Sequence, residues 1–469
     1  MQRLWGLFLY SVLAFTLNFK LNAERLLLSK DCDLTYNQKL ETALEYETAI
    51  DTKANTKANT KTGTKNIFDT EHPVKKKKIV LVMCKGGYGH VAACLTLTEC
   101  LSPYYDVSTI DFIETIYNSL DPVRTITFGK ASGNDMYNGL LQAGWIRLSN
   151  WMYRNIAPTA ILSNKKKIER KTFAFFEKEQ PDMIISAFPI FNLPISNVAH
   201  RLNIPFMLVT TEADLTNWLL NLHKIKHKNY VITVTDSWPK TEKQLKSRGI
   251  KSENIKKIGL PRRKDFLGEK NLPEIRAQWN IPDNKFVIMI MMGGTGSNVA
   301  YKYAKKISKM KDLNVHLLVC IGRSVELAEK LSTLKPEPGV SLTTIPFTKQ
   351  ISDLMAVSNL LITKTGPGSI DEAIHMQLPI LLDKTNPILF WERANVDIVT
   401  HQKYGDVVKS FSQLEKLIHT YVNDKAYYAT IKNNLKKHAP YIFDREIVKL
   451  VAQMFPKQQT SEVSSDIIK

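Results

Sequence analysis

Residues 363–395, TKTGPGSIDEAIHMQLPILLDKTNPILFWERAN, hold the pattern that decides the fold. The apolar run 360–362 before them predicts the end of a buried strand, and the run 379–382 predicts the next strand. Between these strands a turn of two glycines and a proline, 366–368, leads into a predicted helix at 369–374. Such a turn is an anion site, because free backbone N–H groups and the helix dipole favour negative charge at a helix N-terminus.

The chemistry expected at this turn follows from its residue types. Gly366 and Gly368 let a diphosphate approach the backbone closely, and Ser369 follows them at the start of the helix. Glu372 is expected in the first helical turn, where a negative side chain is favoured and where it could accept hydrogen bonds from a ribose diol. On composition alone, an ordinary βαβ crossover with a glycine-bearing turn is the alternative.

Two further glycine turns follow predicted buried strands. The run 79–83, IVLVM, precedes 85–93, KGGYGHVAA, and the run 286–292, FVIMIMM, precedes 293–297, GGTGS. Continuous apolar runs are typical of parallel sheets, and the first turn indicates a mononucleotide-binding fold although it is not a full G-x-G-x-x-G. His90 follows three glycines and leads a helix of small residues, which is a position for a substrate-facing side chain. A structural histidine is the alternative.

The motif within residues 363–395 resembles the donor-binding signature of a glycosyltransferase family. This family comprises the GT-B enzymes that include monogalactosyldiacylglycerol synthase, the processive diacylglycerol glucosyltransferases and the lipid II N-acetylglucosaminyltransferase, and it is family 28-like. Its pattern is K-x-GPG-[ST]-I-x-EA, then GLPIIL, then QE-x-x-N. This chain has KTGPGSIDEA at 364–373, LPILL at 378–382 and WERAN at 391–395. Trp391 stands where the family has glutamine, which leaves the identity of the donor sugar open.

The first half of the chain resembles the same family less specifically. The motif GGGH-x-[AS]-[AS]-A is similar to residues 86–93, with Tyr88 in place of a glycine. The motif QPD-x-IIS-x-HP is similar to residues 180–189, with Phe188 in place of the usual histidine. The resemblance covers roughly residues 76–410.

The resemblance implies a role for each candidate site residue. It implies that Glu372 binds the ribose and that Glu392 and Asn395 hold the hexose hydroxyls. Arg323 and Phe347 resemble the family's residues on the uracil side. The second glycine loop lies against the donor phosphates in this family, which implies contacts by Gly293, Gly294, Thr295 and Gly296.

The mechanism implied by the resemblance is an inverting, metal-independent single displacement. His90 is the candidate base, and the ordinary pKa of histidine suits that role. No D-x-D motif occurs at either glycine loop, so we expect neither a metal site nor a cofactor besides the UDP-sugar donor. The expected function is transfer of a hexosyl group from a UDP-sugar to a lipid acceptor such as diacylglycerol. Two alternatives stay open: a UDP-sugar epimerase of the same fold, and an exported transferase that acts on a non-lipid target or merely binds it.

The expected fold class is α/β, of the GT-B type, with two Rossmann-like domains whose parallel sheets face a central cleft and a C-terminal helix that crosses back. The expected boundaries are a signal peptide or hydrophobic anchor at 1–23, a low-complexity linker at 24–73, an N-terminal acceptor-binding domain at 74–261, a C-terminal nucleotide-sugar-binding domain at 262–440, the crossing helix at 441–456 and a disordered tail at 457–469. The apolar run near the N-terminus is shorter than the roughly 20 residues that a bilayer span needs. A buried core helix is the alternative there.

The charge balance points to an anionic partner. A formal net charge of +19 favours nucleic acid or an anionic membrane surface. The aromatic segment 137–153 lies close to the lysines at 165–167, and aromatic groups beside a basic cluster suit a membrane interface. An amphipathic core helix with a charged outer face is the alternative.

The resemblance selects among these partners, because the equivalent region of the galactolipid synthases carries the lipid acceptor and touches anionic lipids. The expected partners are therefore a UDP-sugar, a lipid acceptor and an anionic membrane surface, with no nucleic acid. The expected location is membrane-associated, with the N-terminal segment serving in anchoring or export. The five cysteines show neither a zinc spacing nor a disulfide framework.

Overall fold

The computed structural model describes residues 76–235, 238–293, 297–438 and 442–455, and it separates a unit 1–74 from a unit 75–469. The expected leader at 1–23, the linker at 24–73 and the tail at 457–469 therefore lie outside the described residues.

The first domain is built on a six-stranded sheet in which every neighbouring pair of strands is parallel. The strand order is β2-β1-β3-β4-β5-β6. The strands are β1 (Lys78–Met83), β2 (Asp106–Asp111), β3 (Met183–Ser186), β4 (Phe206–Val209), β5 (Tyr230–Val234) and β6 (Ile255–Lys257). Its α-helices are α3 (Tyr88–Leu101), α4 (Pro122–Ile126), α5 (Gly133–Gln142), α6 (Ile146–Ser163), α7 (Lys165–Glu179), α8 (Asn192–Leu202) and α9 (Pro239–Ser247).

The second domain repeats this architecture with a second six-stranded parallel sheet, in the order β12-β11-β10-β7-β8-β9. The strands are β7 (Phe286–Met291), β8 (Val315–Gly322), β9 (Val340–Pro346), β10 (Leu360–Thr363), β11 (Ile380–Asp383) and β12 (Gly405–Val408). Its α-helices are α10 (Leu272–Gln278), α11 (Asn298–Ile307), α12 (Val325–Ser332), α13 (Ile351–Ala356), α14 (Pro367–His375), α15 (Arg393–His401), α16 (Phe411–Asn423) and α17 (Lys425–Lys436).

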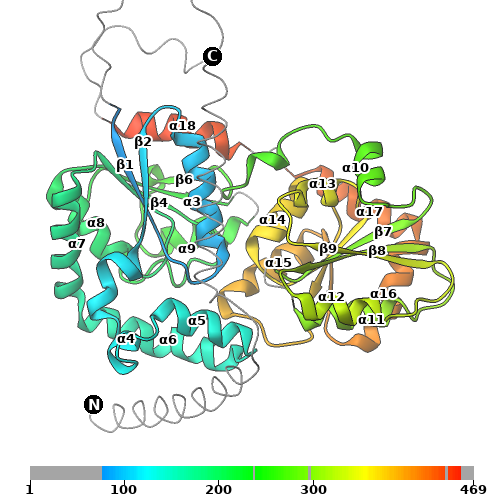
Figure 1. Ribbon diagram of the computed structural model, residues 1–469. Helices are drawn as coiled ribbons and strands as arrows, with labels where there is room; N and C mark the ends of the chain where they lie inside the picture. Colours follow the sequence, from blue (N-terminus) through cyan, green and yellow to red (C-terminus); the bar gives the residue numbers. More distant parts are fainter. Residues whose placement is uncertain (1–75, 236–237, 294–296, 439–441, 456–469) are drawn as a thin grey trace, which may run out of the picture. The chain divides into compact units, whose positions relative to one another are not determined.

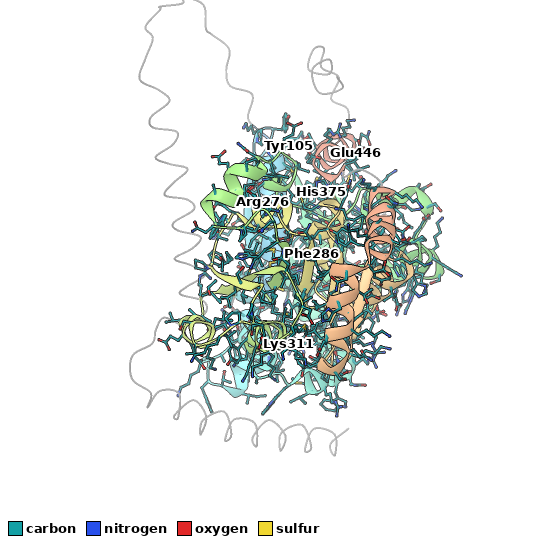
Figure 2. The ribbon with its side chains drawn as sticks, turned by 90° about the vertical axis from the view of Figure 1, so that its right-hand side faces the viewer. Tyr105, Arg276, Phe286, Lys311, His375 and Glu446 are labelled. Atoms are coloured by element: carbon teal, nitrogen blue, oxygen red, sulfur yellow. The ribbon has the colours of Figure 1, made fainter. Side chains whose placement is uncertain are left out.

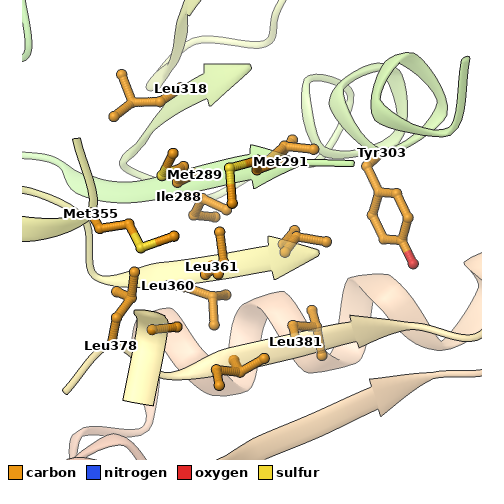
Figure 3. Close-up of a cluster of buried hydrophobic side chains, with 14 of the residues drawn as sticks. Ile288, Met289, Met291, Tyr303, Leu318, Met355, Leu360, Leu361, Leu378 and Leu381 are labelled. Carbon is orange, nitrogen blue, oxygen red and sulfur yellow. The ribbon is translucent and has the colours of Figure 1, made fainter. Parts of the chain in front are cut away.

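The apolar runs of the sequence form the sheets because both faces of each parallel sheet are covered. In β1, Ile79 and Leu81 pack into the core on one face, whereas Val80 and Val82 pack into the core on the other. This alternation is the two-residue period of a strand. Figure 3 shows part of the core of the second domain, where Ile288 and Met289 of β7 lie beside Leu360 and Leu361 of β10.

The C-terminal helix α18 (Phe443–Met454) packs on the first sheet. Phe443, Ile447 and Val451 belong to the core that contains Ile79 and Leu81, and Figure 1 shows the helix beside α3. The chain therefore returns from the second domain to the first. The predicted fold class, a GT-B arrangement of two parallel sheets with a crossing C-terminal helix, is confirmed.

The prediction that Glu372 lies in the first turn of its helix was wrong, because the helix after the turn at 366–368 begins earlier than expected. Helix α14 starts at Pro367, with Gly366 as its N-cap residue. Proline is favoured at the first helical position, where its missing N–H group is not needed. Glu372 therefore lies in the second turn of α14, and the first turn holds no acidic residue. His375, labelled in Figure 2, ends this helix and lies with Nε2 3.0 Å from the Phe266 carbonyl oxygen.

The aromatic segment 137–153 spans two helices, the end of α5 and the start of α6. The break between them contains Gly144 at φ +71°, a left-handed conformation that glycine adopts without strain. Figure 1 shows α4, α5 and α6 together at one end of the first domain. Segment 137–153 therefore belongs to a helical layer beside the sheet.

Candidate active site

The N-terminus of α14 retains the properties of an anion site. No side chain caps it, and neither α14 nor α11 has an acidic residue in its first turn. Gly368 is exposed, and a Cβ built on it would meet nothing within 4 Å. The positive end of the helix dipole is therefore not offset by its own side chains, which favours binding of a phosphate.

Lys364 lies between the two glycine loops of the second domain. A Cβ built on Gly293 would lie 3.6 Å from Lys364 Nζ, and one built on Gly366 would lie 3.4 Å from Lys364 Cε. Gly293 has φ +105°, which a residue with a side chain rarely adopts. Gly294, Thr295 and Gly296, also predicted to contact phosphates, lie outside the described residues. The lysine thus places a positive charge beside Gly293 and Gly366, which suits an anionic ligand.

Glu372 is held by an arginine that follows the first domain. Arg263 Nη2 donates to Glu372 Oε1 at 3.1 Å, and 16% of the Glu372 side chain is exposed. Burial raises the pKa of the Glu372 carboxyl, and Arg263 opposes this shift. The arginine thus holds the predicted ribose-binding carboxylate from the segment that follows the first domain.

Arg323 and Phe347, both predicted to lie on the uracil side, contact each other. The Arg323 guanidinium carbon lies 4.0 Å from the centre of the Phe347 ring, and 44% of Phe347 is exposed. Phe347 N donates to the Gly322 carbonyl oxygen at 2.9 Å, which holds the backbone of Phe347 at the ends of β8 and β9. An exposed aromatic ring stacked with a guanidinium can receive a planar base.

Glu392 and Asn395 meet beside α14 through Thr365. Thr365 Oγ1 donates to Glu392 Oε2 at 2.6 Å, and Asn395 Nδ2 donates to the Thr365 carbonyl oxygen at 2.9 Å. Asn395 is buried, whereas Glu392 is half-buried. The two residues predicted to hold a hexose therefore lie next to Gly366, at the anion site. Trp391 packs against Tyr153 and Phe390, with ring centres 5.8 Å and 4.8 Å away.

A carboxyl group of the first domain, that of Glu212, lies near Asn395 and Glu392. Glu212 follows β4, and its side chain accepts a hydrogen bond from Asn395. Burial, followed by the nearby Glu392 carboxylate, raises the pKa of Glu212 well above its ordinary value. Glu212 Oε2 is buried and has no hydrogen-bond partner among the described residues. This carboxyl group is therefore a candidate hydrogen-bond donor to a sugar hydroxyl.

His90, the third residue of α3, is oriented by a backbone carbonyl. Its Nδ1 lies 2.9 Å from the Ala187 oxygen, which can only accept, so the proton resides on Nδ1 and the lone pair on Nε2. Phe188 and Trp218 lie with ring centres 6.2 Å and 5.9 Å from the imidazole. Burial lowers the pKa of His90 to about 4. The expectation of an ordinary histidine pKa was therefore wrong, because the sequence did not reveal these surroundings.

Two family models match the two domains separately. Residues 90–261 match the model of monogalactosyldiacylglycerol (MGDG) synthase, and residues 287–383 match the glycosyltransferase family 28 C-terminal domain. Each domain of the chain is therefore similar to a glycosyltransferase model, the first to MGDG synthase and the second to family 28.

Curated relatives extend over most of this glycosyltransferase. It is 24% identical over 406 residues to the processive diacylglycerol beta-glucosyltransferase of Bacillus subtilis (strain 168), covering 83% of this chain and 99% of the relative. It is 26% identical over 390 residues to the chloroplastic monogalactosyldiacylglycerol synthase of Spinacia oleracea, covering 78% of this chain and 70% of the relative.

Solved structures share the fold of the glycosyltransferase. MurG of Acinetobacter baumannii matches with a TM-score of 0.56 and 14% identity, over 81% of this chain and 99% of that one. Os79 of O. sativa, in complex with U2F and trichothecene, matches with a TM-score of 0.52 and 12% identity, over 80% of this chain and 100% of that one.

Sequence reasoning missed three charged residues that the structure of the glycosyltransferase brings to the site: Lys364, Arg263 and Glu212. A signal existed for Lys364, which lies in the K-x-GPG motif. Arg263 had no such signal, because its partner Glu372 is 109 positions away. The roles of the predicted site residues themselves stay predictions.

The base assignment predicts a selective loss of turnover. His90→Ala should lower the rate of sugar transfer by roughly 10² to 10⁴-fold, because a general base contributes about that much. His90→Asn keeps an N–H donor for the Ala187 oxygen but lacks the Nε2 lone pair, so it should lose turnover equally while its melting temperature stays near that of the wild type. UDP affinity, measured by calorimetry, should not change in either variant. Full turnover in a stably folded His90→Asn protein would remove the assignment.

The ribose assignment predicts weaker nucleotide binding. Glu372→Ala should weaken UDP binding at least about tenfold in calorimetry, because it removes a charge-assisted hydrogen bond. Glu329→Ala, an exposed glutamate of α12 in the same domain, is the matched control and should bind UDP normally. If Glu372→Ala binds UDP as tightly as the control, Glu372 does not contact the ribose.

Proposed function

We propose that the protein transfers a hexosyl group from a UDP-sugar to a hydroxyl group of a lipid acceptor such as diacylglycerol, with inversion at the anomeric carbon. The match of each domain to a transferase family carries this proposal: the MGDG synthase model on residues 90–261 and the family 28 C-terminal model on residues 287–383. One curated relative is named a diacylglycerol beta-glucosyltransferase and the other a monogalactosyldiacylglycerol synthase, and both matches span most of this chain.

In the proposed reaction, the acceptor oxygen attacks the anomeric carbon while the bond from that carbon to the phosphate oxygen breaks. The acceptor proton passes to His90 Nε2, and the electron pair of the broken bond leaves on UDP. The N-terminus of α14 and the Lys364 ammonium would stabilise the charge that develops on the diphosphate. These groups supply positive charge without a metal ion, and we keep metal independence as part of the proposal.

The two alternatives drawn from the sequence are not favoured. An epimerase of this fold needs no lipid acceptor, whereas the first domain matches a model of a lipid-modifying transferase. A transferase acting on a non-lipid target, or a protein that merely binds one, is likewise not favoured, because the relatives are named for glycosylation of diacylglycerol or formation of its galactosyl product.

The same proposal includes docking on an anionic membrane surface through α6 and α7. Helix α6 and the residue before it expose a set of apolar side chains, and Trp145 and Trp151 are 44% and 52% exposed. Leu148 and Leu162 are the other exposed apolar residues of this set. Exposed basic side chains flank it: Arg147 and Arg154 on α6, and Lys166, Lys167, Arg170 and Lys171 on α7. Interfacial aromatics beside basic groups bind anionic lipid surfaces.

Within the residues that the structure describes, no helix is long and apolar enough to cross a membrane. The predicted leader at 1–23 lies outside these residues, so anchoring or export through it stays a prediction.

The transfer itself can be tested directly. Protein lacking residues 1–73 should convert diacylglycerol in vesicles to a glycolipid when given one of a panel of labelled UDP-glucose, UDP-galactose and UDP-N-acetylglucosamine, and should release UDP in equal amount. The product should have the opposite anomeric configuration to the donor, and EDTA should not slow the reaction. Conversion of the UDP-sugar to an epimer without lipid product would contradict the proposal.

Docking predicts binding that depends on both charge and aromatic groups. The same protein should sediment with anionic vesicles and dissociate as salt rises, because exposed charges are screened beyond about 10 Å at 0.1 M salt. Replacing Trp145 and Trp151 by serine should weaken this binding, whereas Tyr104→Ser, a 48% exposed aromatic residue elsewhere on the first domain, should not. Equal binding to neutral and anionic vesicles would contradict the electrostatic part.

A further inference from the structure

A short loop of the second domain has its hydrophobic partners in the first domain. Leu389, Phe390 and Trp391 are buried and form a cluster of their own, apart from the core of the second domain. The partly buried residues packed against this cluster all come from α5 and α6: Tyr137, Leu141, Ile146 and Tyr153. We call residues 388–392 the sugar loop, because they include Glu392. The loop would expose three large apolar side chains if the first domain did not cover it.

One side chain of α6 fixes the backbone of the sugar loop by two hydrogen bonds. Asn150 Nδ2 donates to the Ile388 carbonyl oxygen at 2.9 Å, and Asn150 Oδ1 accepts from Phe390 N at 2.9 Å. A single amide thus satisfies a donor and an acceptor two residues apart in the other domain. The Arg154 guanidinium, one turn further along α6, lies 4.6 Å from the centre of the Phe390 ring.

The position of Glu392 depends on this loop. Glu392 N donates to the Leu389 carbonyl oxygen at 3.0 Å, in a 3-10 turn at Phe390–Glu392. Its carboxylate is fixed at the other end by the Thr365 hydroxyl, next to Gly366. The backbone that Asn150 holds is therefore the backbone from which Glu392 reaches the anion site.

The nucleotide part of the donor site does not share this dependence. The residues expected near the diphosphate, the ribose and the base are Lys364, Glu372 and Phe347. All three belong to the second domain and lie outside the sugar loop. Among the described residues, Asn150 forms its hydrogen bonds with the sugar loop and none with Lys364, Glu372 or Phe347. Loss of Asn150 should therefore affect the sugar and the nucleotide differently.

We propose that Asn150 is a positioning residue for donor-sugar recognition: helix α6 of the acceptor domain completes the hexose site by holding the sugar loop of the other domain. The proposal rests on the proposed function, since it takes Glu392 as a hexose contact. Its physical basis is that a loop whose apolar side chains are buried in another domain, and whose backbone is hydrogen-bonded there, keeps its conformation only while those contacts persist.

The test compares two ligands on the full-length protein. Asn150→Ala should weaken binding of UDP-glucose and of UDP-galactose, whichever the wild type accepts, by about tenfold, the effect of one to two lost hydrogen bonds. UDP affinity should stay within about twofold of the wild type. Asn150→Asp is nearly isosteric and still accepts from Phe390 N, but it cannot donate to the Ile388 oxygen, so it should show the same selective loss.

The matched control is Asn155→Ala, because Asn155 is an exposed asparagine of the same helix whose Nδ2 donates to Trp151 O at 2.8 Å within α6. It should bind both ligands normally. The proposal is overturned if Asn150→Ala and Asn150→Asp bind the UDP-hexose like the control, or if they lose UDP and UDP-hexose affinity equally. A wild type that binds no UDP-hexose would instead contradict the proposed function, so the two failures are distinguishable.

Discussion

The buried ion pair between Arg262 and Asp371 ties the segment that leaves the first domain to the helix that carries the anion site. Arg262 Nη2 lies 2.8 Å from Asp371 Oδ2, and only 2% of the arginine side chain and 12% of the aspartate side chain are exposed. Removing one partner of such a pair leaves an uncompensated buried charge, which costs about 3 to 5 kcal/mol. The next residue, Arg263, pairs with Glu372 one position further along α14. Two consecutive arginines thus fix α14 relative to the start of the second domain, and the other site residues of α14 depend on that placement.

The positive groups of the site lie apart from its carboxyl groups, at different positions along the expected donor. The end of α14 without acidic first-turn residues and the Lys364 ammonium lie where a diphosphate is expected, whereas Glu392 and Glu212 lie together beside Asn395. Burial, and after it the nearby Glu392 carboxylate, raises the pKa of Glu212 well above its ordinary value. Such an arrangement suits a ligand that is anionic at one end and rich in hydroxyl groups at the other.

Helix α6 connects the proposed lipid surface with the proposed hexose site. Its outward side chains include Trp151 and Leu148, while Asn150 and Tyr153 contact the sugar loop. One helix therefore carries both the surface that would meet the membrane and the contacts that hold a loop of the other domain. The substitution of Trp391 for the family's glutamine belongs to the same contacts, because this ring packs against Tyr153.

The sequence by itself determined the two parallel sheets, the glycine turns and the family. These features are local: apolar runs, turn glycines and motif spacing are each read within a few tens of residues. Only the tertiary structure decided that Glu372 pairs with Arg263, that Phe188, Trp218 and Ala187 surround His90, and that Asn150 holds the sugar loop 238 positions away. The structure also shows that Glu372 lies in the second turn of α14 and not in the first. The charges around a residue and the hydrogen bonds between the domains depend on which side chains, far apart in the sequence, the fold brings together. A local sequence pattern does not show which side chains these are.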